Sequence, residues 1–202
     1  MDIAIVAAKR TPMGAFLGAL AEVTAPELGA CAIEAALQQS GLSPEQVDEV
    51  FMGNVLAAGV GQAPARQALL KAGLPDSVPA TTVNKVCGSG MKAVMLAADT
   101  IRLGDNRVVV AGGMESMSRA PYLLDNARSG FRMGHQKVLD HLFLDGLQDA
   151  YDGQLMGIHA QCSADQAGLT RTAMDEFALA SLQRARDAQQ AGAFASELAS
   201  VY

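Results

Sequence analysis

Apolar segments of two kinds alternate along the first 113 residues of the chain. Four runs indicate strands: residues 3–6, 49–56, 79–86 and 107–113, of which the last is a continuous β-branched run. The segments between them carry apolar residues at helical spacing and begin at capping signals such as Thr24-Ala25-Pro26-Glu27. Continuous apolar strands joined by helices predict an α/β fold with a mainly parallel sheet covered on both faces.

Four helices are predicted within this part of the chain. The first follows Thr24 and ends at Gly41, and a second begins at Ser43-Pro44, where proline takes the first helical position. A short helix occupies residues 63–74 and is closed by Gly73. The helix after Cys87 is apolar nearly all round, so we expect it to be buried between layers.

Beyond residue 114 the pattern becomes mixed and richer in charge, with glycines as punctuation. This part is predicted to be a loop-rich excursion from the sheet. Thr170 then caps a helix with Met174, Ala178 and Leu182 on one face, ending near Gly192. Residues 196–202 resemble the start of a further strand.

Composition and charge exclude several classes of function. The chain has 202 residues, 50% of them hydrophobic, and a formal net charge of −6, without a basic run typical of nucleic-acid or membrane-surface binding. No apolar stretch reaches the length of a membrane span, and no signal sequence opens the chain, which favours the cytoplasm. The three unevenly spaced cysteines form neither a disulfide framework nor a metal cluster, so no metal site is expected.

Cys87 is the candidate nucleophile. It lies at a predicted strand-to-helix junction, where free backbone N–H groups and the helix dipole stabilise a thiolate. Gly88, Ser89 and Gly90 leave room for a substrate to approach the backbone, and their N–H groups could hold a developing oxyanion. These features are typical of acyl transfer. Cys31 and Cys162 are interpreted as small core residues.

A dinucleotide-binding fingerprint is an alternative interpretation of the same segment. Residues 88–93 fit G-x-G-x-x-A between a strand and a helix, with Asp105 near the offset of a ribose-binding acid. The match falls on a late strand, however, and Asp105 precedes its strand instead of ending one. A nucleotide-binding α/β domain therefore stays the weaker alternative.

Several motifs resemble the thiolase family. "NKVCGSGMKAV" (residues 84–94) is similar to the segment that carries the acyl-accepting cysteine of that family, and "VVVAGGMESMSRAPY" (108–122) to the strand and loop that follow it. Residues 7–20 and 53–75 match the thiolase pattern in order and spacing. Residues 131–157 resemble the loop region of the thiolases that are acetyl-CoA acetyltransferases.

The resemblance implies a thiolase-like fold and Claisen chemistry on coenzyme A thioesters. Residues 1–118 would form the N-terminal αβα core with the nucleophile, and residues 119–202 part of the loop domain, with the C-terminal half absent. Cys87 would accept an acetyl group from acetyl-CoA, releasing CoA, and a second acetyl-CoA would attack to give acetoacetyl-CoA, with thiolysis as the reverse. No cofactor is implied, because the coenzyme A thioester is itself the substrate.

The resemblance also implies roles for residues of the excursion. Leu147 and Met156 match positions that line the thioester and pantetheine pocket, while Leu155 stands where some thiolases have a histidine. The family associates this region with subunit contacts, which implies a homo-oligomer, a dimer or tetramer, in the complete enzyme. A CoA-phosphate contact is the alternative for four basic residues: Arg119, Arg128, Arg132 and Lys137.

The second half of a thiolase supplies the activating histidine, an asparagine and a second cysteine, none of which this chain matches. His135, His141 and His159 are expected at the surface or at an interface. The chain is therefore interpreted as the N-terminal half of a thiolase: a truncated reading frame, a fragment, or a split subunit whose partner is the complementary C-terminal half. A 3-ketoacyl-CoA thiolase of longer chain preference and a non-catalytic thiolase-like scaffold remain alternatives.

Overall fold

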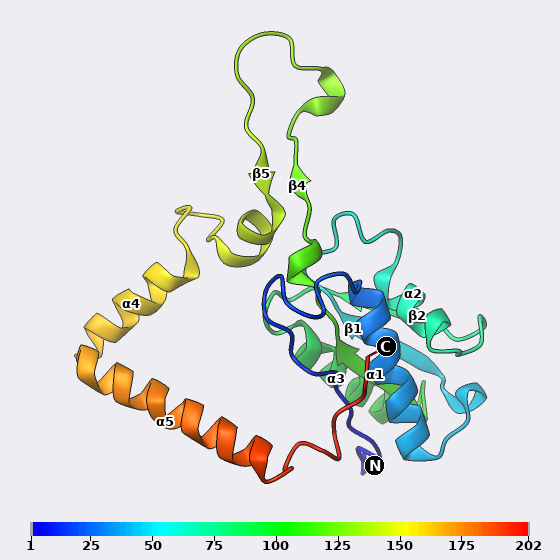
Figure 1. Cartoon of the computed structure of the whole chain (residues 1–202). Helices are drawn as coiled ribbons and strands as arrows, with labels where there is room; N and C mark the ends of the chain where they lie inside the picture. Colours follow the sequence, from blue (N-terminus) through cyan, green and yellow to red (C-terminus); the bar gives the residue numbers. More distant parts are fainter. Residues whose placement is uncertain (1, 202) are drawn as a thin grey trace.

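A three-stranded parallel sheet forms the centre of the N-terminal part of the protein, in the computed structural model that describes residues 2–201. Its strands are β1 (Glu49–Gly53), β2 (Ala80–Val83) and β3 (Val109–Gly113), in the order β2-β1-β3 (Figure 1). Val50 pairs with Ala80 on one side and with Val110 on the other. The prediction of an α/β fold with a parallel sheet is confirmed.

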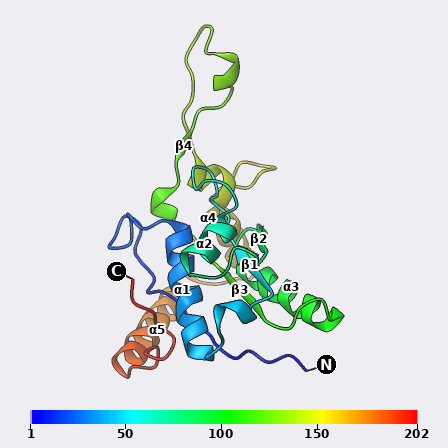
Figure 2. The same ribbon diagram turned by 90° about the vertical axis from the view of Figure 1, so that its right-hand side faces the viewer.

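Helices cover both faces of this sheet (Figures 1 and 2). Helices α1 (Ala25–Ser40) and α2 (Pro64–Lys71) pack on one face and α3 (Ser89–Leu103) on the other. Residues 50–52 of the central strand are all apolar because successive side chains enter different cores. Val50 belongs to the cluster with α1 and α2, whereas Phe51 packs with residues of α3.

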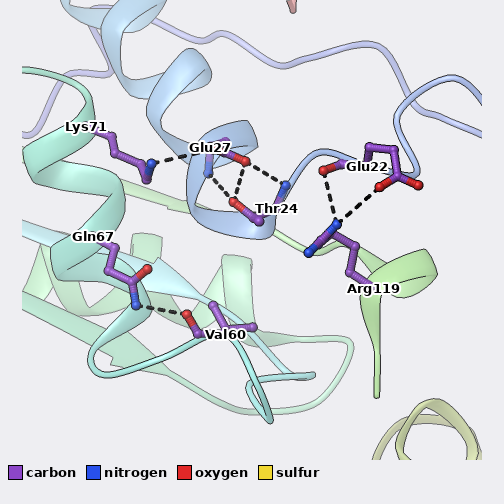
Figure 3. Close-up of polar contacts among 7 residues, drawn as sticks. All are labelled: Glu22, Thr24, Glu27, Val60, Gln67, Lys71 and Arg119. Carbon is purple, nitrogen blue, oxygen red and sulfur yellow. Dashed lines mark hydrogen bonds and ion pairs between the residues drawn. The ribbon is translucent and has the colours of Figure 1, made fainter. Parts of the chain in front are cut away.

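The start of α1 is fixed by the capping box that the sequence predicts. The Glu27 N–H donates to Thr24 Oγ1 (3.4 Å), and the Thr24 N–H donates to Glu27 Oε2 (2.9 Å). The Thr24 hydroxyl also donates to Glu27 Oε2 (2.6 Å). This bond first, then the one from the Thr24 N–H, with Lys71 of α2 3.5 Å away, holds the pKa of the Glu27 carboxyl below its usual value (Figure 3). Gly41 ends the helix with φ of 70°, a left-handed conformation that suits glycine.

Two predicted elements are much shorter than expected. The helix predicted to begin at Ser43-Pro44 is a single 3₁₀ turn, η1 (Pro44–Gln46). The C-terminal strand is reduced to one parallel bridge between Arg10 and Leu198, in which the Arg10 N–H donates to the Glu197 carbonyl (2.9 Å). This bridge brings the end of the chain back to its beginning.

The buried N-terminal strand predicted for residues 3–6 is wrong for this structure. The segment is extended but pairs with no strand among the described residues, and the side chains of Ile5 and Val6 are 81% and 65% exposed. A cavity of 340 Å³, lined mainly by apolar side chains, lies between residues 3–7 and β3. An apolar run forms a buried strand only where a neighbouring strand is close enough to pair.

Helix α3 also differs from its prediction, because only one of its faces is buried. Ala93 and Ala97 pack against the sheet, whereas Met91 and Leu103 are 74% and 76% exposed. No described part of the chain forms a layer outside α3, so its apolar outer face is left uncovered.

The excursion, residues 122–190, extends away from the sheet. Strands β4 (Tyr122–Leu123) and β5 (Leu139–Asp140) form the base of an antiparallel hairpin that points upward in Figure 1. A π-helical turn, η4 (Phe143–Leu147), follows, and then α4 (Met156–Gln166) and α5 (Arg171–Gln190) form an arm. Thr170 caps α5 as predicted, its Oγ1 accepting from the Ala173 N–H (3.2 Å). Within residues 2–201, no helix combines the length and the apolar character that a bilayer crossing requires.

Candidate active site

Cys87 is exposed on a tightly braced turn between β2 and α3. The buried hydroxyl of Ser89 accepts from the Lys85 N–H (2.9 Å) and donates to the Val86 carbonyl (2.6 Å). Val86 has φ of 46°, which is strained for a β-branched residue and is a feature that clusters at functional sites. The Asn84 carboxamide supports this conformation by accepting from the Val86 N–H (2.9 Å). These bonds hold the backbone of the turn that carries Cys87.

The first turn of α3 lies directly on the carboxyl ends of β1 and β3, and glycines permit this contact. A Cβ atom added to Gly53 would lie 2.7 Å from the Ser89 carbonyl carbon, and one added to Gly113 would lie 3.3 Å from Gly90 Cα. Side chains at these positions would push the helix off the sheet. The glycines thus set the position of the helix that follows Cys87.

The N–H groups near Cys87 are not equally available to a ligand. The Gly88 N–H donates to the Lys85 carbonyl (3.0 Å) and the Ser89 N–H to the Val86 carbonyl (3.1 Å), so both are engaged in the turn. The Gly90 N–H makes no hydrogen bond within the part of the chain that the structure describes. Of the two glycines predicted to support an oxyanion, Gly90 therefore retains the free donor.

Cys87 lines a cavity of 420 Å³. Three other segments form its walls: the end of β1 with residues 54–56, the loop after β3, and the segment 142–147 that includes η4. Leu147 lines this cavity with Cys87, although 60 positions separate them in the sequence. Met156, the other predicted pocket residue, begins α4, is 44% exposed and is not part of the cavity lining.

Asn54 and Glu115 form a hydrogen-bonded pair in the lining of the cavity that was not predicted from the sequence. The Glu115 carboxylate accepts from Asn54 Nδ2 (2.8 Å) and from the N–H groups of Val55 (2.8 Å) and Leu56 (3.1 Å). Asn54 and Glu115 each follow the carboxyl end of a strand, and β1 and β3 are neighbours. The carboxyl ends of parallel strands lie at the same edge of a sheet, so the positions of Asn54 and Glu115 after neighbouring strands could have predicted this pair from the sequence.

Asn54 also leaves one polar atom without a partner. Its side chain is 2% exposed and lines the cavity, yet Oδ1 has no hydrogen-bond donor within residues 2–201. A buried acceptor of this kind is normally satisfied by water or a ligand. The described residues that line the cavity thus include an unpaired acceptor, Asn54 Oδ1, and an unpaired donor, the Gly90 N–H.

A family model described as "Thiolase, N-terminal domain" matches residues 3–202. The chain belongs to the thiolase family. A protein named acetyl-CoA acetyltransferase from Cupriavidus necator is 56% identical over 200 residues, which cover 99% of this chain and 51% of that protein. The protein of the same name from Pseudomonas aeruginosa is 55% identical over 197 residues (98% and 50%), and acetyl-CoA acetyltransferase 2 from Arabidopsis thaliana is 53% identical over 200 (99% and 50%).

The chain thus spans about half the length of the curated relatives that it matches. Membership of the thiolase family argues against the dinucleotide fingerprint, and so does the geometry. Asp105 follows Gly104, which ends α3, whereas the glycines of the fingerprint begin that helix. A 15-residue helix separates the two by roughly 22 Å, too far for one ribose-pyrophosphate unit to be held by both.

The described lining of the cavity offers no free ionisable group that could act as a base beside Cys87. Among the described residues that line it, Glu115 is the one ionisable group besides Cys87, and three hydrogen bonds already occupy its carboxylate. His135 lies in the exposed hairpin and His159 on α4. Neither lines the cavity, as expected for residues of the excursion.

Three single-residue expectations need correction or refinement. His141 is 5% exposed and not a surface residue, because its ring packs between the hairpin base and the loop after β1. Cys162 is exposed and not a core residue, because no layer formed by residues 2–201 covers α4. Cys31 is partly buried; its thiol donates to the Ser200 carbonyl (3.0 Å), and burial raises its pKa.

The basic residues predicted as alternatives for phosphate binding differ in their surroundings. Arg119 is engaged within the chain: its guanidinium donates to the Glu22 carbonyl (3.3 Å) and lies 3.6 Å from the Glu22 carboxylate (Figure 3). Arg128, Arg132 and Lys137 are exposed in the hairpin, which lies before α4 in the chain and far from the sheet (Figure 1). Their roles stay predictions.

Three possible metal ligands lie together beside α4. The ligand atoms of Asp149, Asp152 and His159 are within 4.8 Å of one another. Asp149 is already committed to its loop, accepting from the N–H groups of Tyr151 (2.9 Å) and Asp152 (3.0 Å), and the bond from Asp152 is the main reason that its pKa is lowered. Loop structure accounts for this cluster.

Proposed function

We propose that this chain is the nucleophile-bearing half of an acetyl-CoA acetyltransferase of the thiolase family. The observation that carries the proposal is the placement of Cys87: an exposed thiol on a strained, fully braced turn at a helix start, lining a 420 Å³ cavity. The relatives named acetyl-CoA acetyltransferase support the choice of an acetyl group.

The first step is acyl transfer to the cysteine. The Cys87 thiolate attacks the thioester carbonyl carbon of acetyl-CoA, a C–S bond to the enzyme forms, and coenzyme A leaves as its thiolate. The Gly90 N–H, whose hydrogen-bonding capacity is free, is the candidate donor to the oxyanion of the tetrahedral intermediate. Leu147 and the other apolar wall residues exclude water from the thioester.

The second step joins two carbon atoms. A second acetyl-CoA loses a methyl proton, its carbanion attacks the acetyl-cysteine, and acetoacetyl-CoA forms while the Cys87 thiolate is regenerated. This step requires a base at the methyl carbon, and Glu115 is already committed to Asn54, Val55 and Leu56. We therefore assign the base to a complementary C-terminal half, as the resemblance to thiolases implies.

Two surfaces support docking of such a second half. The edge of β3 opposite β1 faces the 340 Å³ apolar cavity, and the outer face of α3 exposes Met91, Met95 and Leu103. Unpaired strand edges and exposed apolar faces are normally covered in a finished fold. Homo-oligomerisation and a cytoplasmic location stay part of this proposal, with acetyl-CoA and CoA as the small-molecule partners.

Acetylation of Cys87 is the decisive experiment. Incubation with acetyl-CoA, followed by peptide mass spectrometry, should find the acetyl group on Cys87 in the wild type and in Cys162→Ser, and on no cysteine in Cys87→Ser. The isolated chain should form no acetoacetyl-CoA, because it lacks the base. An unmodified Cys87 would favour the non-catalytic scaffold, and faster labelling by octanoyl-CoA than by acetyl-CoA would favour a 3-ketoacyl-CoA thiolase.

A further inference from the structure

His141 connects two segments that line the Cys87 cavity, the loop after β1 and η4, and is not itself part of the lining. Its ring is 5% exposed and makes one hydrogen bond in each direction. Nδ1 lies 2.5 Å from Asp145 Oδ2, within η4, and Nε2 lies 3.3 Å from the Ala58 nitrogen, in the loop after β1. Since the Ala58 N–H can only donate, Nε2 must accept, and the ring proton therefore resides on Nδ1 and is donated to Asp145.

Both bonding partners of His141 belong to segments that line the cavity. Residues 54–56 precede Ala58 and form one wall, while Leu142, Gly146 and Leu147 form the other. The walls touch at a position where little space is left, since a Cβ atom on Gly146 would lie 3.3 Å from Leu56 Cδ2. A displacement of η4 would therefore move Leu147 and change the width of the cavity.

Segment η4, which His141 contacts through Asp145, has an uncommon backbone conformation and few hydrogen bonds to the rest of the described chain. Segment η4 is a π-helix, closed by the Gln148 N–H donating to the Phe143 carbonyl (2.8 Å), and such turns are rare and frequently occur at functional sites. The two residues before η4 form hydrogen bonds to the hairpin base: the His141 N–H donates to the Pro121 carbonyl (3.2 Å) and the Leu142 N–H to Asp140 Oδ1 (2.8 Å). The His141 ring connects η4 to the loop after β1 through its hydrogen bonds to Asp145 and Ala58.

We infer that His141 is a positioning residue that sets the width of the Cys87 cavity by bridging Asp145 and Ala58. It acts through Leu147 and Gly146 and does not touch the reacting atoms. That the cavity receives a thioester rests on the proposed function; the bridge and its effect on access to Cys87 do not.

The tautomer of the ring is the first test. Long-range ¹H–¹⁵N NMR of the whole chain at neutral pH should show His141 protonated on Nδ1 and unprotonated on Nε2, the opposite of the form that predominates in free histidine. His135, exposed in the hairpin, is the internal reference. A proton on Nε2 of His141 would overturn the inference, because Ala58 could not then donate to it.

Reagent access to Cys87 is the second test, and it requires no acyl transfer. The rates of alkylation by iodoacetamide and by the bulkier N-phenylmaleimide are measured at Cys87 and, in the same sample, at the exposed Cys162. His141→Leu should raise the bulky-to-small rate ratio at Cys87 about fivefold, as expected for loss of one or two hydrogen bonds that hold the wall. The ratio at Cys162 should not change.

Matched variants separate bridging from simple packing. His141→Gln can still accept from Ala58 and should restore much of the wild-type ratio, while Asp145→Ala should raise the ratio in the same direction as His141→Leu. His135→Leu, in the hairpin, should behave as the wild type. A wild-type ratio in folded His141→Leu would overturn the inference, and if that variant fails to fold, Asp145→Ala, whose side chain is half exposed, decides it.

Discussion

The sheet layer (residues 25–113) and the excursion (122–190) both contain well-formed amphipathic helices, but only the first buries them. Helix α2 has eight residues, four of them buried, whereas α5 has twenty residues, none of them buried. Phe177 and Leu179 of α5 are 73% and 66% exposed. The excursion therefore owes its helices to local signals such as the Thr170 cap, whereas the sheet layer owes them to packing.

This difference shows that an apolar periodicity predicts an element better than it predicts burial. The helix after Thr170 and the helix after Thr24 carry equally clear signals, and both form. Burial depends in addition on a second surface, which α1 finds in α2 and β3, and which α5 does not find among the described residues. The two regions should therefore respond very differently to equivalent substitutions.

Matched leucine truncations should give the largest contrast. Leu69 is 0% exposed in the core between α1, α2 and the sheet, so Leu69→Ala should lower the free energy of unfolding by about 2–5 kcal/mol. Leu179→Ala on α5 should change it by less than about 0.5 kcal/mol. Urea denaturation followed by far-UV circular dichroism measures both. Equal losses would mean that α5 is part of the cooperative unit.

The fold class and most elements were predictable because their signals are local. The capping box at Thr24, the Gly41 and Gly73 helix ends and the apolar strands each depend on a few neighbouring residues. The failures, residues 3–6 and the outer face of α3, have the right composition for burial. What they lack is a neighbouring strand or layer, and no local pattern reports whether one is present.

Matched glycine substitutions should give a smaller contrast, in which one variant is less stable than the wild type and the other is more stable. Gly53→Ala places a Cβ atom 2.7 Å from Ser89 backbone and side-chain atoms, so we expect a loss of about 1–3 kcal/mol and a displaced α3 start. Gly157, in the first turn of α4, has open space around its Cβ position, and Gly157→Ala should stabilise α4 by up to about 0.5 kcal/mol.

Unfolding midpoints test the glycine pair, and the reactivity of Cys87 adds a local readout. Because Ser89 braces the turn, Gly53→Ala should also alter the alkylation rate of Cys87, whereas Gly157→Ala should not. A Gly53→Ala variant as stable as the wild type would show that the helix start can move away from β1 without cost.

The candidate site was predictable only in part, for the same reason as the fold. Cys87 stands out because strand, turn and helix signals are contiguous around it. Asn54 and Glu115 follow from the rule that parallel strands end together. His141 does not, since its partner Ala58 is 83 positions away and the contact exists only once the hairpin has folded back. The exposure of Met156 follows from the position of α4, which no sequence signal fixes.

Two aspartates offer the finest comparison, because each accepts two backbone N–H bonds. Asp48 accepts from Arg107 (2.7 Å) and Val108 (2.9 Å), and these bonds, the one from Val108 foremost, lower its pKa from the ordinary 3.8. They link the starts of β1 and β3, so they are lost on unfolding. The bonds of Asp149 run to Tyr151 and Asp152, in the same loop. A depressed folded pKa gives stability that is complete above 3.8 and is lost as the pH falls through the lower folded value.

The free energy of unfolding should fall as the pH decreases below about 4, and Asp48→Asn should make this fall less steep. The difference should be below about 1 kcal/mol, because the carboxylate is exposed to solvent. Asp149→Asn should leave the slope unchanged, since its bonds are local to a loop outside the sheet layer. Urea titrations at several pH values between 3 and 6 measure both slopes. An equal change of slope in the two variants would indicate that the loop before α4 unfolds together with the sheet. The sheet layer and the excursion would then not differ in how they contribute to stability.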